Sequence, residues 1–196
     1  MMNHRITVLG VPFDRVTLSE AVRRLDGACK KEAVFFCVTP NPEICLLAQK
    51  NTAYHSLLKS SQLSIADGFG ILWAARFLSG NRSFIRWLGT LLTPFLTRKY
   101  SPLRERVTGT DLMQQFCKLH KDRKIFLLGA SKRVNDTLAQ QLKESGVNIV
   151  GNFSGDASEK LEASIRSMIN ASGAEVLFVA FGAPKQEKWQ HRHLLK

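Results

Sequence analysis

Residues 125–150 read IFLLGASKRVNDTLAQQLKESGVNIV. The stretch begins with an apolar run, Ile125–Leu128, passes through a turn into a helical pattern over Lys132–Glu144, and returns to an apolar run at Asn148–Val150. Strands that are apolar on both faces are typical of buried parallel sheets, in which consecutive strands are joined by a crossover helix. The stretch therefore predicts a βαβ unit.

The same alternation of strands and helices extends over the rest of the chain. Further strands are predicted at Ile6–Leu9, Val34–Val38, Leu63–Ala66 and Val176–Ala180. Helices are predicted from Thr17, where Glu20 completes a capping box, and over Pro42–Gln49, Gly70–Phe77, Asp111–Leu119 and Ser158–Asn170. We therefore predict an α/β fold, a parallel sheet flanked by helices within a single domain over 1–196. Ligands of such sheets bind at the carboxyl ends of the strands.

Composition restricts the class of protein. The 196 residues suffice for one α/β domain, and a hydrophobic content of 44% argues against disorder. No secretory signal and no run of about eighteen apolar residues is present, so we expect a cytoplasmic protein or one at the membrane surface. The four cysteines show no CxxC spacing, which favours reduced thiols over metal ligands.

The net charge of +12 is unevenly distributed. Between Arg76 and Arg133, thirteen Lys and Arg residues face three acidic ones, an excess of ten positive charges. Such a stretch attracts nucleic acid, phosphorylated ligands or an anionic membrane, although a soluble basic surface gives the same pattern. Nucleic acid is the least favoured partner, because no aromatic stacking motif accompanies the charge.

Short polar side chains follow two of the predicted strands. Thr39 and Asn41 lie in TPNPE, where Asn41 is either a ligand-binding group or the cap of the next helix. Asp67 begins DGFG, either a carboxylate whose following glycines let a ligand approach the backbone or a simple Asp–Gly turn.

Three later segments add candidate groups. Arg106 precedes TGTD, in which Thr110 is the expected helix cap; its guanidinium either holds a diphosphate or is one solvated arginine among many. The turn at 129–131 leads into a helix whose amides can receive phosphate, yet no GxGxxG supports a conventional dinucleotide site. Gln186 lies in FGAPKQEKW, a polar cluster above a strand end that indicates a site.

Taken in order, these segments closely resemble the WecG/TagA/CpsF glycosyltransferases. The segments that carry the resemblance are TPNPE, DGFG, RVTGTD, FLLGAS and FGAPKQEKW. The resemblance implies a Rossmann-like domain that transfers an N-acetylmannosamine-type sugar from a UDP donor, with inversion, to an undecaprenyl-diphosphate-linked sugar. The products of that family feed teichoic acid, common antigen or capsule synthesis, and no metal or other cofactor is expected.

The resemblance also implies a role for each candidate residue. Asp67 becomes the general base that deprotonates the acceptor hydroxyl. Thr39 and Asn41 fall beside the sugar and the acceptor, and Gln186 becomes a donor-binding group. Arg106 would neutralise the charge on the departing UDP in place of Mg²⁺. We expect the chain to work at the cytoplasmic face of the plasma membrane, to contact anionic lipid, not to bind nucleic acid, and, like its relatives, to be able to form homo-oligomers.

Two departures from the family pattern matter. An inserted segment at about 80–103 has an apolar face with basic flanks, which suits either a helix in the lipid headgroup region or an extra helix packed on the core. The sequence also ends at Lys196, where relatives continue into a basic C-terminal appendage, so we expect that appendage to be missing. The alternative function is accordingly a truncated, catalytically weak membrane-binding or assembly remnant of the family.

Overall fold

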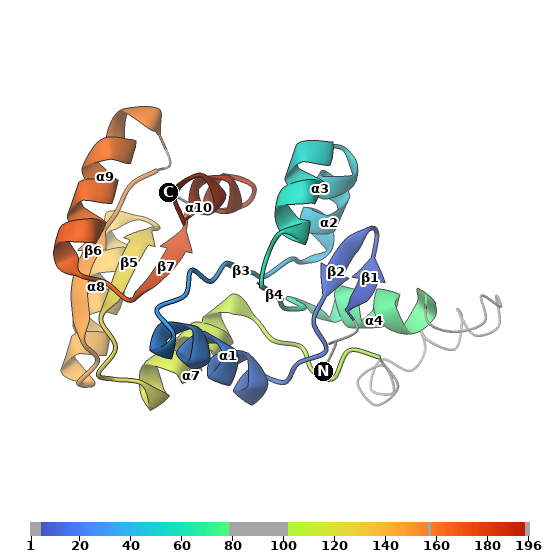
Figure 1. Ribbon diagram of the computed structural model, residues 1–196, viewed down its shortest axis with the longest axis horizontal. Coiled ribbons are helices and arrows are strands. Elements are labelled where there is room, and N and C mark those ends of the chain that lie inside the picture. Colours follow the sequence, from blue (N-terminus) through green and yellow to red (C-terminus); the bar gives the residue numbers. More distant parts are fainter. Residues whose placement is uncertain (1–4, 79–101, 157, 195–196) are drawn as a thin grey trace. The chain divides into compact units, whose positions relative to one another are not determined.

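The computed structural model describes residues 5–78, 102–156 and 158–194, which belong to two compact units (Figure 1). The first unit comprises Met1–Leu25 and Phe35–Leu112, and the second comprises Asp26–Val34 and Met113–Lys196, each as far as it is described. Most of the predicted inserted segment at 80–103 lies outside the described residues.

The first unit opens with a hairpin that the sequence did not reveal. Strand β1 (Ile6–Val8) pairs antiparallel with β2 (Val11–Phe13). Leu9 and Gly10 form the two-residue turn with φ of 50° and 82°, as a tight hairpin requires. The expectation that this first strand is one of the parallel strands was wrong, because Leu-Gly is a weak turn signal and β2 is only three residues long.

A short parallel pair lies at the centre of the first unit. Strand β3 (Cys37–Val38) pairs with β4 (Leu63–Ser64). Helix α2 (Pro42–Gln49) has the predicted bounds, whereas α3 (Thr52–Lys59), which Asn51 caps, was not predicted.

Helix α4 (Phe69–Leu78) follows β4, and α7 (Gly109–Leu119) begins in the first unit. The chain before α7 runs alongside the extension of β4, since the Val107 N–H donates to the Ala66 carbonyl at 3.1 Å. Three chain segments therefore lie together where β3 and β4 end.

Helix α1 (Leu18–Lys30) begins with the predicted capping box. The Thr17 N–H donates to the Glu20 carboxylate at 2.8 Å, and the Glu20 N–H donates to the Thr17 hydroxyl at 3.3 Å. Each side chain thus satisfies a backbone donor that helix geometry leaves without a partner.

Removing this cap tests how much local structure contributes to stability. We expect Thr17→Ala to lower the free energy of unfolding by about 1 kcal/mol, because the Glu20 N–H loses its acceptor. The measurement is urea unfolding followed by circular dichroism. Ser19→Ala is the matched control, since Ser19 is exposed in the same turn and makes no cap bond; an equal loss in both variants would contradict the assignment.

The second unit contains the predicted βαβ arrangement (Figure 1). Strand β5 (Ile125–Gly129) lies between β6 (Ile149–Phe153) and β7 (Val176–Ala180), and it is parallel to both. The described helices that lie wholly in this unit are α8 (Lys132–Glu144), with the predicted bounds, α9 (Glu159–Ser172) and α10 (Lys185–Leu194).

Both faces of this sheet are covered. Phe126 and Leu128 of β5 are buried with Ile165 of α9 and Trp189 of α10. Phe178 of β7 contacts Phe116 of α7 edge-on, with ring centroids 6.2 Å apart. Because successive strand residues point to opposite faces, and the neighbours of Phe178 pack with the Trp189 cluster, α7 covers the other face.

The prediction of an α/β fold with parallel strands flanked by helices is confirmed. Within the described residues the strands form three separate hydrogen-bonded sheets, so one Rossmann-like sheet and a single domain over 1–196 stay predictions. The four cysteines are free, as predicted, and burial raises the pKa of the Cys45 thiol to about 12. No helix within the described ranges has the length and apolar character needed to cross a membrane.

Candidate functional site

Four of the five predicted site residues lie in the first unit, on the segments that meet beyond β3 and β4. Thr39 and Asn41 follow β3, Asp67 follows β4, and Arg106 precedes Val107. The Asp67 N–H donates to the Pro40 carbonyl at 3.1 Å, which joins the two strand ends. The position expected for a ligand site, at the carboxyl ends of parallel strands, is therefore where these residues are found.

Asn41 caps helix α2. Its Oδ1 accepts a hydrogen bond from the Ile44 N–H at 2.9 Å, and Pro42 occupies the first helical turn. The capping interpretation of Asn41 is thus confirmed. Since the amide oxygen is engaged in the cap, the amide NH₂ group is the part of Asn41 that can donate to a ligand.

Gly109 lies close to two of the candidate residues, Asp67 and Thr39. Its backbone N–H donates to the Asp67 carboxylate. A Cβ placed on Gly109 would lie 3.3 Å from Thr39 Cγ2, which is tighter than most real contacts, and 3.5 Å from Thr39 Oγ1, an ordinary contact distance. The first turn of α7 therefore approaches both Asp67 and Thr39, and a larger residue at 109 would require the Thr39 side chain to shift by a few tenths of an ångström. Sequence reasoning did not single out Gly109, because its importance depends on contacts with distant residues.

The start of α7 differs from the expectation in one detail. The cap is Thr108, whose hydroxyl accepts from the Asp111 N–H at 3.0 Å, and not Thr110. The helix begins at Gly109, so Thr110 already lies inside its first turn. The shift brings Gly109 to the helix N-terminus, where backbone N–H groups favour a negative group such as the Asp67 carboxylate.

The surroundings of Asp67 alter its acidity. Burial raises the pKa of the Asp67 carboxyl, and the Asp111 carboxylate adds to the rise. The Gly109 N–H and the positive charge of Arg106 lower the pKa and offset part of that rise. The carboxylate is therefore more basic than an exposed one, which suits a group that takes up a proton.

The raised pKa predicts a pH-dependent stability difference between the wild type and Asp67→Asn. The folded state holds the Asp67 proton more tightly than the unfolded state does. Below the pKa of the carboxyl in the unfolded state, its ionisation does not affect the free energy of unfolding. As pH rises through the pKa in the folded state, ionisation lowers that free energy. We expect Asp67→Asn to melt at a higher temperature than the wild type at pH 7, and the difference to vanish on acidification.

Thermal unfolding of both proteins across pH 3 to 8 measures this difference. Asp111→Asn provides a second comparison. Removing the Asp111 charge lowers the Asp67 pKa, so the difference in melting temperature between this variant and Asp67→Asn should be smaller than that between the wild type and Asp67→Asn. A wild type that gains stability relative to Asp67→Asn as pH rises would reverse the sign and contradict the assignment.

An aromatic ring holds Arg106. The Arg106 Cζ lies 5.0 Å from the centroid of the Phe69 ring, and Phe69 is 60% exposed at the start of α4. A guanidinium over an aromatic face is attracted to the ring and loses less water than one in a closed pocket. Phe69 therefore keeps the Arg106 charge near Asp67, a role that sequence reasoning missed although Phe69 lies within DGFG.

The two glycines of DGFG, Gly68 and Gly70, lie where the backbone bends tightly or packs closely. A Cβ on Gly70 would lie 2.7 Å from Pro42 Cγ, and Gly68 adopts a φ of 113°. Both glycines are thus explained by the local structure. Gly70 allows α4 to pack closely against the start of α2, and Gly68 allows a tight bend after Asp67. The expectation that they open the backbone to a ligand does not account for Gly70.

Gln186, the fifth predicted site residue, belongs to the second unit. Its Oε1 accepts from the Gly182 N–H at 3.1 Å, and its Nε2 donates to Glu187 at 2.9 Å. The side chain thereby holds the turn between β7 and α10, and its role as a donor-binding group stays a prediction.

The turn after β5 is also held firmly. The Ala130 N–H donates to the Ala180 carbonyl at 2.8 Å, and the buried Asn135 donates from Nδ2 to the Gly129 carbonyl at 2.8 Å. Asn152 in turn donates to Asn135 Oδ1 at 2.8 Å, which links the ends of β5 and β6. Sequence reasoning missed Asn135, although a polar residue on the inner face of α8 is a signal for such a link.

The fold and these contacts define an α/β protein with a carboxylate and an arginine at the ends of parallel strands. The chain belongs to the glycosyl transferase WecG/TagA/CpsF family, which it matches over residues 6–101 and 84–196. The family resemblance seen in the sequence motifs is thereby confirmed, and with it the class of enzyme, a glycosyltransferase.

Similar proteins include two from Staphylococcus aureus, strains MRSA252 and NCTC 8325 / PS 47. Each is an N-acetylglucosaminyldiphosphoundecaprenol N-acetyl-beta-D-mannosaminyltransferase, 26% identical over 193 residues. The similarity covers 96% of this chain and 68% of each relative.

Proposed function

We propose that this chain transfers an N-acetylmannosamine-type sugar from a UDP donor to an undecaprenyl-diphosphate-linked N-acetylglucosamine, with inversion at the anomeric carbon. The names of the S. aureus relatives support the sugar and the acceptor. The family membership supports the reaction class. The product would enter the synthesis of a cell-surface polysaccharide.

The proposal is supported most by the position of Arg106, which lies in the same unit as Asp67 and close enough for its charge to act on that carboxylate. Asp67 is half-buried with a raised pKa, and the positive charge of Arg106 acts on it. A single displacement with inversion needs one base on the acceptor and positive charge on the leaving group. Asp67 and Arg106 offer these two groups within the same unit.

The Asp67 carboxylate takes the proton of the acceptor hydroxyl, whose oxygen attacks the anomeric carbon of the donor. The bond between that carbon and the UDP oxygen breaks, and UDP leaves with the bonding electron pair. Arg106 offsets the charge that grows on the diphosphate, while Thr39 and Asn41 hold the substrates. For Gln186 the family resemblance implies a donor-binding role.

We also propose that the reaction needs neither a metal ion nor another cofactor. The Arg106 guanidinium supplies the positive charge that Mg²⁺ supplies in other transferases, and it forms bidentate bonds with phosphate oxygens. Because the proposed acceptor is linked to a lipid, we also propose that the chain acts at the inner face of the plasma membrane, where it contacts anionic lipid. The homo-oligomer expected from the family belongs to this proposal as well.

The test is UDP release from UDP-N-acetylmannosamine in the presence and absence of a soluble lipid-linked N-acetylglucosamine analogue, with and without EDTA. We expect release that requires the acceptor and persists in EDTA. Binding of UDP without any turnover would instead favour the catalytically weak remnant of the family. Failure to bind UDP would contradict the proposed site.

A further inference from the structure

Helix α4 is apolar on nearly every side. Among its residues, FGILWAARFL, only Arg76 carries a charge and the others are apolar. Ile71, Leu72 and Ala75 are buried, and the helix packs against strand β1 (Figure 1). A helix at the surface of a folded unit ordinarily presents polar residues on the side away from the core. The composition of α4 therefore indicates that its other side also contacts something apolar.

Three aromatic residues form a row along that other side, which we name the aromatic row. Phe69, Trp73 and Phe77 follow at intervals of four residues, so the helix places them one above another. Because a helix turns by about 100° per residue, the row lies roughly opposite the buried residues. The Trp73 and Phe77 rings are stacked, with centroids 5.8 Å apart and planes inclined by 6°. The row is a strip of aromatic surface about 12 Å long.

The aromatic row keeps part of its surface accessible. Phe69 is 60% exposed, and Trp73 and Phe77 are half-buried. Water does not solvate aromatic carbon well, so an accessible apolar strip of this kind is typical of a surface that binds a ligand or a membrane. A strip one helix wide fits an elongated apolar ligand.

The aromatic row begins at the candidate site. Its first member, Phe69, follows Asp67 by two residues and lies under the Arg106 guanidinium at 5.0 Å. All of these residues belong to the first unit. A substrate that places its hydroxyl at Asp67 therefore has the row within reach of its remaining part.

The groups along α4 follow the order of the groups in the proposed acceptor. Asp67 comes first, then the Phe69 ring, and then Arg76, which lies three residues beyond Trp73 and so beside the row. The acceptor has a hydroxyl, a sugar ring, a diphosphate and a long hydrocarbon chain. Aromatic rings bury a large apolar area each, and an arginine suits a diphosphate. This match favours the acceptor as the occupant of the row.

We propose that the aromatic row binds the isoprenoid chain of the lipid-linked acceptor, at the end next to the diphosphate. The inference rests on the proposed function, because it needs an acceptor whose sugar is joined to a long apolar chain. Trp73 and Phe77 then determine the preference for a lipid-linked acceptor over one without the lipid.

The test compares two soluble N-acetylglucosamine diphosphate analogues, one with a farnesyl tail and one with a methyl group. Titration calorimetry on the full chain without donor gives the ratio of the two affinities. We expect the wild type to bind the farnesyl analogue about tenfold or more tightly, because the tail buries apolar surface on the row. Equal binding of the two analogues overturns the inference.

The variants are Phe77→Gln and the double variant Trp73→Gln with Phe77→Gln. We expect the double variant to reduce the preference for the farnesyl analogue to within about threefold, since most of the aromatic contact area is lost. Phe77→Gln should reduce the preference by a smaller factor. Because Phe77 lies in the last turn of α4, this variant keeps the test valid if the double variant unfolds.

Leu46→Gln is the matched control, because Leu46 is a 53% exposed apolar residue on α2 in the same unit. We expect it to keep the preference of the wild type. An equal loss of preference in Leu46→Gln and the double variant would mean that the tail adheres to apolar surface in general, which overturns the assignment to the row.

The other occupants of the row are a bilayer and a further part of this chain. Variants that lose flotation with phosphatidylcholine vesicles but keep the preference would assign the row to the bilayer. Variants that melt at a lower temperature but keep the preference would assign it to packing within the chain. Either result overturns the inference.

This binding measurement needs no turnover, so it separates the inference from the proposed function. Acceptor-dependent UDP release together with equal binding of the two analogues would overturn the role of the row alone. Absence of UDP release with a clear farnesyl preference would count against the transfer reaction and not against the apolar contact.

Discussion

Asp67→Asn is expected to lower acceptor-dependent UDP release by about 10²- to 10⁴-fold, the range that a general base contributes. The asparagine keeps the size of the side chain and its amide oxygen can still accept the Gly109 N–H, so the geometry of the site is retained. What the variant loses is the ability to take the proton of the acceptor hydroxyl. The measurement is kcat/KM for the acceptor, together with calorimetry of UDP binding.

The control for this variant is Glu144→Gln, which removes a carboxylate from the exposed end of α8. We expect its turnover to equal that of the wild type. UDP should bind to Asp67→Asn as tightly as to the wild type, because the base acts on the acceptor. Turnover of Asp67→Asn within a few-fold of the wild type would remove Asp67 from the mechanism.

Arg106→Gln is expected to lower kcat by about 10²- to 10³-fold, the size of effect seen when a donor to a developing negative charge is removed. The charge on the diphosphate grows as the bond to the sugar breaks, so the loss should fall mainly on kcat and less on KM. Steady-state kinetics with varied UDP-sugar separate the two parameters.

Phe69→Leu tests the contact between the Phe69 ring and the Arg106 guanidinium. Leucine preserves apolar bulk but lacks the ring face on which the Arg106 guanidinium lies, so we expect a smaller loss of kcat than in Arg106→Gln. Arg133→Gln serves as the surface control, because Arg133 is an exposed arginine on α8. If removing Arg106 raises KM and leaves kcat unchanged, its role is in substrate binding and not in stabilising the departing UDP.

Features set by neighbouring residues were predicted well. The bounds of α2 and α8 agree with the structure, and the Thr17–Glu20 capping box forms as expected. Caps, prolines in the first turn and apolar runs act within a few residues, so the chain carries that information locally. The parallel strands of the second unit were found for the same reason.

Features that depend on distant contacts were missed or misjudged. The β1–β2 hairpin forms although its turn is a weak signal, and its Gly10 carbonyl lies 2.8 Å from the His55 ring. Thr108, and not Thr110, caps α7. In each case the neighbouring residues allow more than one arrangement, and packing selects one.

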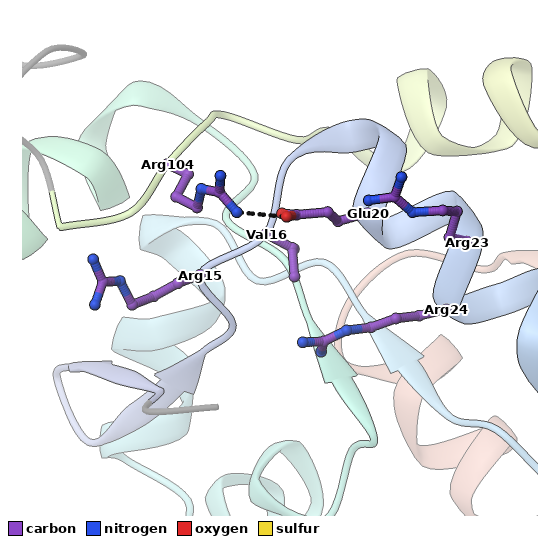
Figure 2. Close-up of a pocket in the computed structure, with 6 residues that line it drawn as sticks. All are labelled: Arg15, Val16, Glu20, Arg23, Arg24 and Arg104. Atoms are coloured by element: carbon purple, nitrogen blue, oxygen red, sulfur yellow. Dashed lines mark hydrogen bonds and ion pairs between the residues drawn. The ribbon is translucent and has the colours of Figure 1, made fainter. Parts of the chain in front are cut away.

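The amino-acid sequence alone specified the α/β class and the strand ends at which Thr39, Asn41 and Asp67 lie, because periodicity and turn residues act over short distances. It placed Arg106 before a helix, and the tertiary structure brought that segment alongside the extension of β4. Tertiary structure alone brought Gly109 against Asp67 and Thr39 and laid Arg106 over Phe69. It also gathered four arginines around one pocket beside the start of α1 (Figure 2), namely Arg15, Arg23, Arg24 and Arg104. Those contacts join residues far apart in the chain. Their burial and charge come from the packed fold, and no local pattern encodes them.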